Sequence, residues 1–215
     1  MALIDDIRSR VMQVLNELMP GDDAYNDILS FDMDNCINEA GRRVALAAPL
    51  YLLTPHETNA LSLNGSSVVV KGHIVRVPLP QYYLRLFSAK LPGWEHPVYG
   101  NELITPEHSL YARQANKMTA GGVHKPVVAI VGGYLELYSL AEGTGQDQII
   151  EIEYFSNADI SKWEEDTEDI GYPSGLIEPV VWQTVSLLFN IMEEHDNAAF
   201  AQNRCNELLS LTRAL

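Results

Sequence analysis

The chain has 215 residues, of which 47% are hydrophobic and 8% aromatic, so it is long enough for a core and unlike a disordered chain. We expect one domain, or one domain with an elaboration. The formal net charge of −15 argues against sequence-independent nucleic-acid binding, which needs clustered Lys and Arg. Such a surface gives solubility, and it would also let DNA slide past without sticking; composition leaves both interpretations open.

The N-terminal residues, MALIDDIRSR, carry acids and lack an apolar run followed by a cleavage site. We therefore expect no signal peptide and synthesis in a cytoplasm. Apolar residues at spacings of three and four predict an amphipathic helix over residues 2–19, which Pro20 and Gly21 end.

A second helix is expected to begin after Asp22 or Asp23, either of which can cap it, and to run to about residue 48. Arg42 and Arg43 near its end are interpreted as a basic pair in contact with solvent. The alternative is a contact with a partner or with a nucleic-acid phosphate.

In the middle of the chain the apolar period changes from about 3.6 to about 2, which predicts strands. Residues 51–63 are expected to form only a connector. Glycines between β-branched runs predict two hairpins, one joining residues 67–71 to 73–77 and one joining 125–131 to 134–140. Further strands are predicted over residues 83–91 and 148–155, the latter with one face in water.

Two other segments interrupt the strands. Thr105, Pro106 and Glu107 combine a capping hydroxyl, a proline and an acid, which predicts a short helix to about Gln114. Residues 159–169 are acidic and lack the Asp, Asn and Gly spacing of a calcium loop, so we expect a solvated loop.

The stretch around which the chain is organised spans residues 176–194 and reads LIEPVVWQTVSLLFNIMEE. It is apolar on nearly every side, which predicts a central, buried helix with Pro179 in its first turn. Polar residues interrupt it and it is too short to span a membrane. A last helix over residues 198–211, capped by Asp196 or Asn197, should lean on it through Phe200, Cys205, Leu208, Leu209 and Leu211.

The sequence therefore predicts an α+β fold, in which N- and C-terminal helices form a bundle and the β-rich middle consists of antiparallel, sandwich-like hairpins. The helical part covers residues 1–50 and 174–215. The β-rich insertion covers residues 51–173, and the whole forms one composite domain.

No chemical site stands out, and we expect no catalytic, cofactor-binding or metal-ligating residues. Cys36 and Cys205 are interpreted as buried reduced thiols, with a disulfide between the terminal helices as the alternative. The six histidines show no metal-ligand spacing, and His195, although it lies among acids, is interpreted as a polar residue at a helix end rather than a metal ligand.

Two further motifs have ordinary explanations. Glu151 and Glu153 share one strand face, as a glycosidase pair could, but edge strands also carry such acids for solubility. Residues 143–145, Gly-Thr-Gly, have no helix after them to bind phosphate, so we interpret them as a turn.

The order of several sequence blocks resembles a known family. The blocks are EAGRRVALAAPLYLL over residues 39–53, VPLPQYYLRLFSAKLPGWEHPV over 77–98, YARQAN over 111–116, GGVHKPVVAI over 121–130 and LELYSL over 135–140. They resemble head–tail connector, or collar-ring, proteins of tailed bacteriophages, in particular crAss-like phages of Bacteroidales. The resemblance covers roughly residues 26–214 and leaves the helix over residues 2–19 outside.

The resemblance implies a structural virion protein and not an enzyme. Such adaptors form rings, commonly dodecamers, below the portal protein and extend the DNA channel from capsid to tail. The implied partners are further copies of the chain, the portal, neighbouring tail or collar rings, and packaged DNA that passes without sequence-specific binding; no membrane is involved. The implied location is the portal and tail region of the virion, after assembly in the bacterial host cytoplasm. We expect the ring contacts on the terminal helices and the hairpins.

Three alternatives remain. The first is another virion component, such as a tail or head-completion protein. The second is a small virion-associated hydrolase, and the third is a bacterial protein with a β binding domain.

Overall fold

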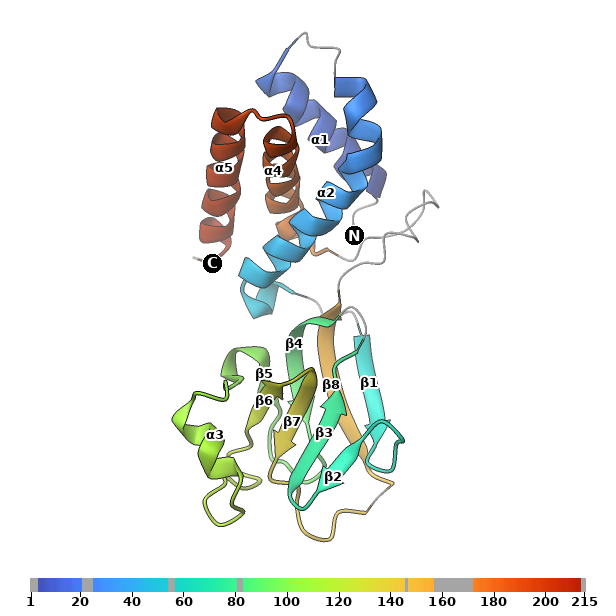
Figure 1. Cartoon of the computed structure of the whole chain (residues 1–215), viewed down its shortest axis with the longest axis vertical. Coiled ribbons are helices and arrows are strands. Elements are labelled where there is room, and N and C mark those ends of the chain that lie inside the picture. The colour runs from blue at the N-terminus through green and yellow to red at the C-terminus, as the bar shows by residue number, and fades with distance from the viewer. Residues whose placement is uncertain are drawn as a thin grey trace. The chain divides into compact units, whose positions relative to one another are not determined.

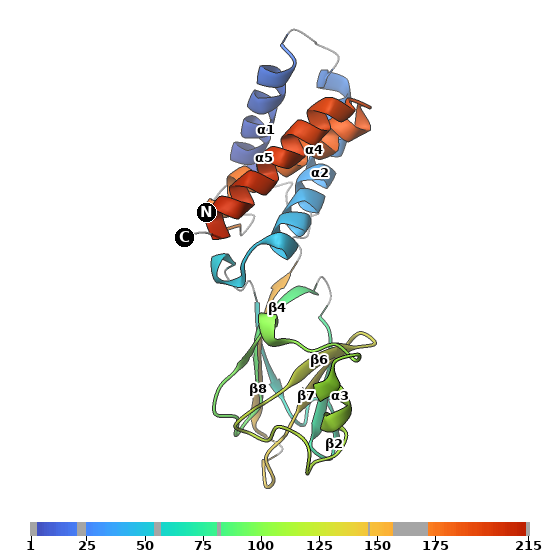
Figure 2. The same cartoon turned by 90° about the vertical axis from the view of Figure 1, so that its left-hand side faces the viewer.

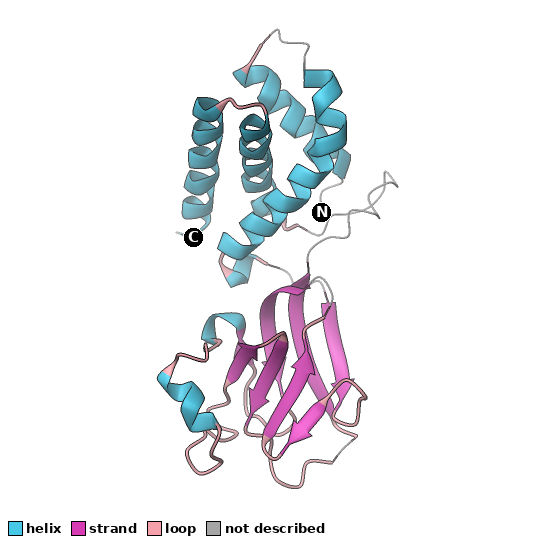
Figure 3. Cartoon of the chain, in the orientation of Figure 1, coloured by secondary structure: helices cyan, strands magenta, loops and turns pink. Residues whose placement is uncertain are grey.

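The computed structural model describes residues 4–20, 25–53, 57–80, 83–145, 147–156 and 172–213. The chain divides into two compact units. The helical unit consists of Met1–Thr54 with Asn157–Leu215, and the β unit consists of Pro55–Ser156. Terminal helices pack together and two antiparallel sheets lie in the middle of the chain, which confirms the predicted α+β class (Figure 3).

The helical unit contains α1 (Ile4–Leu18), α2 (Tyr25–Ala47), α4 (Ser174–Ile191) and α5 (His195–Arg213). The central helix is α4, which packs against each of the other three. In Figure 1, α5 lies on one side of α4, and α1 and α2 lie on the other; in Figure 2, α5 crosses in front of α4, with α1 and α2 on either side of the pair. The prediction of a central C-terminal helix is therefore confirmed.

Burial around α4 follows its apolar pattern. Buried residues fall on all sides of the helix: Leu176, Pro179, Val180, Val181, Gln183, Thr184, Val185, Ser186, Leu188 and Phe189. The prediction that Pro179 lies in the first turn was wrong, because the helix already begins at Ser174. Pro179 has no N–H to donate, so the carbonyl of Gly175 receives no helical hydrogen bond from it.

The end of α4 and the start of α5 both differ from the prediction, and α4 ends at Ile191 rather than at residues 193–195. The chain leaves α4 through a Schellman motif, in which the Glu193 N–H donates to the Asn190 carbonyl at 3.3 Å and the Glu194 N–H donates to the Phe189 carbonyl at 2.9 Å. Helix α5 begins directly afterwards at His195, so Asp196 and Asn197 lie inside its first turn rather than capping it. Leu211, expected against α4, is 62% exposed.

The β unit contains two four-stranded antiparallel sheets that share one core. One has the strand order β1-β8-β4-β5 and the other β2-β3-β7-β6. Their buried residues, such as Leu86 and Ile150 of the first sheet and Val75 and Leu137 of the second, form a single cluster. The strands are β1 (Glu57–Ser62), β2 (Val69–Lys71), β3 (Ile74–Pro78), β4 (Tyr83–Lys90), β5 (Val98–Tyr99), β6 (Val128–Val131), β7 (Tyr134–Tyr138) and β8 (Ile149–Ser156).

Both predicted hairpins are confirmed, as β2–β3 and β6–β7. Their turns contain Gly72, Gly132 and Gly133 at positive φ, the conformation that glycine adopts without strain. Along β8, buried residues alternate with more exposed ones as predicted, except that Phe155, expected on the solvent-facing side, is 2% exposed.

Two other predictions need correction, and a third concerns residues that the structure does not describe. The segment 51–63 is not only a connector, because it completes a 3-10 turn, η1 (Leu50–Leu52), and contains β1, whose register follows from pairing with β8. Strand β4 does not alternate regularly, since register shifts between Tyr83 and Arg85 and between Leu86 and Ser88 interrupt its pairing with β8. The acidic segment 159–169 lies outside the described residues.

The remaining elements are a 3-10 turn, η2 (Gly100–Glu102), and the short helix α3 (Ser109–Gln114). Helix α3 ends where predicted but begins three residues late, because His108 rather than Thr105 caps it: the His108 Nδ1 accepts from the Leu110 N–H at 3.2 Å. Among the helices of the described residues, none is long and apolar enough to cross a membrane.

Candidate assembly surface

Helix α5 has a buried face and an open face. Ala198, Ala201, Cys205 and Leu209 are buried, as a helix packed on α4 requires. Phe200, at 53% exposure, lies with its ring edge-on to that of Trp182 of α4, with centroids 6.1 Å apart. Phe200 and Leu211 are three helical turns apart, and the exposed Arg204–Glu207 ion pair lies between them in sequence. Phe200 and Leu211 are the large apolar side chains that the described part of α5 leaves exposed, and this face is therefore a candidate protein–protein contact.

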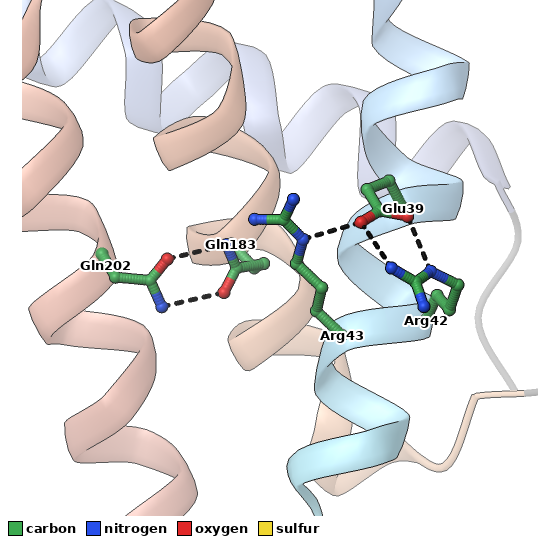
Figure 4. Close-up of polar contacts among 5 residues, drawn as sticks. All are labelled: Glu39, Arg42, Arg43, Gln183 and Gln202. Atoms are coloured by element: carbon green, nitrogen blue, oxygen red, sulfur yellow. Dashed lines mark hydrogen bonds and ion pairs between the residues drawn. The ribbon is translucent and has the colours of Figure 1, made fainter. Parts of the chain in front are cut away.

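A reciprocal amide pair joins α5 to α4 (Figure 4). Gln183 Nε2 donates to Gln202 Oε1 at 2.8 Å, and Gln202 Nε2 donates to Gln183 Oε1 at 2.9 Å. Gln183 is 4% exposed, so each amide satisfies the other where little water reaches. Gln183 is one of the polar residues that interrupt the apolar pattern of α4, and its two hydrogen bonds with Gln202 join this helix to α5.

The basic pair of α2 is partly neutralised within its own helix. Arg42 makes two hydrogen bonds to the Glu39 carboxylate, at 2.7 and 2.9 Å, and Arg43 Nε donates to the same carboxylate at 2.7 Å. Hydrogen bonds from Arg42, then from Arg43, lower the pKa of Glu39 from 4.5 to about 2. Figure 4 shows Arg43 extending from α2 toward α4. The pair is thus half-exposed and anchored, which agrees with a solvated pair and leaves a partner contact untested.

Charge is distributed unequally between the units. The helical unit holds 20 acidic and 7 basic residues, a net charge of −13. The β unit holds 9 acidic and 7 basic residues, a net charge of −2. The acidity inferred from composition is therefore a property of the helical unit.

In the β unit, residues 105–127 form a segment that we call the strap, which contacts the outer face of the β2-β3-β7-β6 sheet. The His73 Nε2 donates to the Gln114 carbonyl at 2.7 Å. Tyr111 of the strap donates to the Glu136 carboxylate at 3.3 Å, and its ring lies edge-on to that of Tyr138 at 6.2 Å. The contacts are mostly polar, and Gln114 is the only buried residue of α3.

The Glu136 carboxylate is 3% exposed and serves as the acceptor at the centre of this contact. It pairs with Arg76 at 2.6 Å and also accepts from the hydroxyl of Tyr138. Burial, followed by the neighbouring Glu136 carboxylate, raises the pKa of Tyr138, so this tyrosine stays protonated. Three donors compensate for the buried charge, which is a structural role.

A pocket of about 290 Å³ lies beside the strap, with His73, Gly122, Val123, Ser139, Leu140 and Glu142 among its lining residues. Ser139 has a positive φ of 68°, and it is held by the Gly122 N–H, which donates to its Oγ at 3.1 Å, and by Trp94 Nε1, which donates to its carbonyl at 3.2 Å. His73 is bound to Gln114 and not to Ser139. These described residues therefore form no nucleophile–base pair of the kind hydrolases use.

The residues considered for chemistry remain apart. Cys36 and Cys205 are buried thiols that form no disulfide with each other, and burial raises the pKa of Cys205 to about 11. Glu151 is exposed, whereas Glu153 accepts from the Ser88 hydroxyl at 2.7 Å. Within the described residues, no group of three or more His, Cys, Asp or Glu side chains could hold a metal ion. His195 is an exposed residue in the first turn of α5.

The Gly-Thr-Gly segment is a turn, as predicted. Gly143 has a φ of 75°, and the Thr144 hydroxyl donates to the Ala141 carbonyl at 2.7 Å.

A scan against protein-family models found no family that matches the chain, and a search of curated proteins found no match.

Proposed function

We propose that this chain is a structural virion protein, a head–tail connector that assembles into a ring below the portal and extends the DNA channel between capsid and tail. Its partners are further copies of itself, in a ring of about a dozen, together with the portal and the adjacent tail or collar rings. Its place is the portal and tail region of the virion, after assembly in the bacterial host cytoplasm. It carries no catalytic role in this proposal.

The observation that carries the proposal is the arrangement of a helical bundle, built from both ends of the chain, with a β unit inserted in it. Both ends of the chain build one helical bundle around α4, and the whole β unit is inserted between α2 and α4. This arrangement, predicted from the residue patterns, suits an adaptor that packs helices side by side in a ring. Of the blocks that resemble connectors, residues 77–98 cover β4 and the turn after it, and residues 121–130 lead into β6.

Two further observations support a ring. Helix α5 packs on α4 and leaves Phe200 and Leu211 exposed, so another copy could cover them in a head-to-tail contact that closes. The net charge of −13 on the helical unit repels phosphates, which suits a wall along which DNA slides.

The first test is the native mass of the purified protein, with negative-stain images of the same sample. Closed rings of about a dozen copies are expected. A strict monomer would be mixed with the portal protein. Capture into a complex would support a connector that waits for its partner, whereas a monomer that the portal also fails to capture would refute the proposal.

A pair of variants tests whether the open face of α5 contributes to the ring. Phe200→Asp should shift the native mass toward the monomer, because a carboxylate would be buried in the contact without a partner. Tyr99→Asp is the matched control, since Tyr99 is a similarly exposed aromatic residue, at 47%, on β5. Equal effects of the two variants would remove α5 from the interface.

A further inference from the structure

The strap has the opposite charge to the rest of the chain. Residues 105–127 contain Arg113, Lys117 and Lys125 against a single acid, Glu107, a net charge of +2 in a chain of −15. All three basic side chains are exposed, and Lys117 pairs with Glu142. Among the described residues, no carboxylate pairs with Arg113 or Lys125.

Apolar side chains lie among these bases. Met118 is 93% exposed and Leu110 is 37% exposed, and each lies within three residues of Arg113 or Lys117 in the chain. Exposed apolar residues beside an unpaired arginine are typical of the residues that anchor a protein–protein contact.

The turn between α4 and α5, together with the helix ends beside it, has the complementary composition. Residues 191–196, which we call the corner, contain Glu193, Glu194 and Asp196 and no Lys or Arg. These three acids are exposed, and none pairs with a basic residue in the part of the chain that the structure describes. Ile191 adds an apolar side chain that is 49% exposed.

The backbone conformation at residue 193 of the corner is one that favours glycine, but the residue there is glutamate. Glu193 occupies the C′ position of the Schellman motif with a φ of 63°, where glycine is usual because it adopts this conformation without strain. A charged residue held in a strained conformation at an exposed corner points to a role for its side chain.

We propose that the strap of one copy docks on the corner of a neighbouring copy, with Arg113 and Lys125 facing the corner acids and Met118 packing near Ile191. The inference rests on the proposed ring function and names the contact that builds the ring. Two different patches of one chain are complementary, so the contact is head-to-tail, the kind that closes into a ring when the rotation allows. The occupant is a second copy because the same chain supplies both charges.

The test uses two opposite charge reversals, Arg113→Glu and Glu194→Arg, in the full chain. Each variant alone places like charges in every contact and should raise the ring dissociation constant at least about tenfold. An equimolar mixture should recover ring formation to within about threefold of wild type, because an alternating ring pairs reversed strap with reversed corner and native strap with native corner. Lys90→Glu is the control, since it makes the same charge change on β4, outside the hairpins, the strap and the corner, and should leave assembly unchanged.

Native mass spectra of the single variants and of the mixture decide between the outcomes. Mixed rings that contain both variants support the inference, and recovery on mixing requires the two patches to lie on different copies. Rings that form equally well from each single variant, or a mixture that stays dissociated, overturn the inference and leave the connector function standing. A wild-type protein that remains monomeric at every concentration also overturns it, while capture by the portal would still support the proposed function.

Discussion

Replacing Glu193 with glycine should make the protein more stable and its ring weaker. The C′ position of α4 has a φ of 63°, and the two hydrogen bonds of the Schellman motif come from the backbone, so both survive the change. Relief of the left-handed strain of a non-glycine residue contributes about 1–2 kcal/mol. The greater freedom of glycine in the unfolded chain offsets about 0.5–1 kcal/mol of that gain.

The net expected gain is about 1 kcal/mol in the free energy of unfolding. For a chain of this length, that corresponds to a rise in melting temperature of about 2–4 °C. The assay is thermal unfolding followed by far-UV circular dichroism, at a concentration where the wild-type protein is dissociated. Helices α4 and α5, which flank Glu193, contribute 18 and 19 residues to the helical signal.

Glu193→Ala is the matched variant, because it removes the carboxylate and keeps the strained backbone. It should not gain stability, and both variants should weaken ring formation to the same extent if the corner acids make the contact. A glycine variant no more stable than the alanine variant would refute the strain argument. A glycine variant that is more stable and assembles normally would remove Glu193 from the contact.

Three further predictions concern the bundle. Leu188→Ala, at 1% exposure in α4, should cost about 2–5 kcal/mol in urea unfolding, whereas Ile191→Ala, on the exposed end of the same helix, should cost less than about 1 kcal/mol. Burial raises the pKa of Cys205 from 9.0 to about 11, so the contribution of the buried thiol to the free energy of unfolding is full below pH 9 and is lost as pH rises toward 11. A thiol reagent at pH 7 should modify Cys205 only when the protein unfolds. The pKa of Glu39 is lowered to about 2, so the contribution of its carboxylate to the free energy of unfolding is present above pH 4.5 and is lost as pH falls to about 2. Glu39→Gln should flatten the dependence of stability on pH in this range, by less than about 1 kcal/mol because the ion pairs are half-exposed.

The elements predicted correctly are those whose signals are local. The apolar period and Pro20 define α1, and the glycines of the turns define the hairpins, because turn geometry depends on the residues in the turn. Strand β1 was missed because ETNALS has little apolar alternation, and its conformation follows from pairing with β8, which is nearly a hundred residues distant in the chain. The start of α5 was missed because Glu193 stands where a glycine would have signalled the motif.

The features of the candidate surfaces could be predicted only in part. The charge of the strap is visible in the sequence, but its exposure depends on how α3 lies on the sheet. Glu136 lies in the apolar strand YLELY, and its burial depends on Tyr111 from a segment that no local pattern connects to β7. The hydrogen bonding of Gln183 similarly depends on Gln202 of the next helix. Polar residues within apolar elements are therefore the positions where tertiary contacts, rather than patterns, decide the role.

Salt should affect ring formation in two opposite ways. Copies with a net charge of −15 repel one another, and this repulsion acts over about 30 Å at 0.01 M salt but only about 8 Å at 0.15 M. The strap and corner charges attract at contact distance, so about 1 M salt, with a screening length of about 3 Å, is needed to weaken them. Ring formation by the wild-type protein should therefore increase from low to moderate salt and decrease at high salt. Arg113→Glu lacks the attraction and should only gain from added salt, so a decrease for this variant at high salt would show that other contacts hold the ring together.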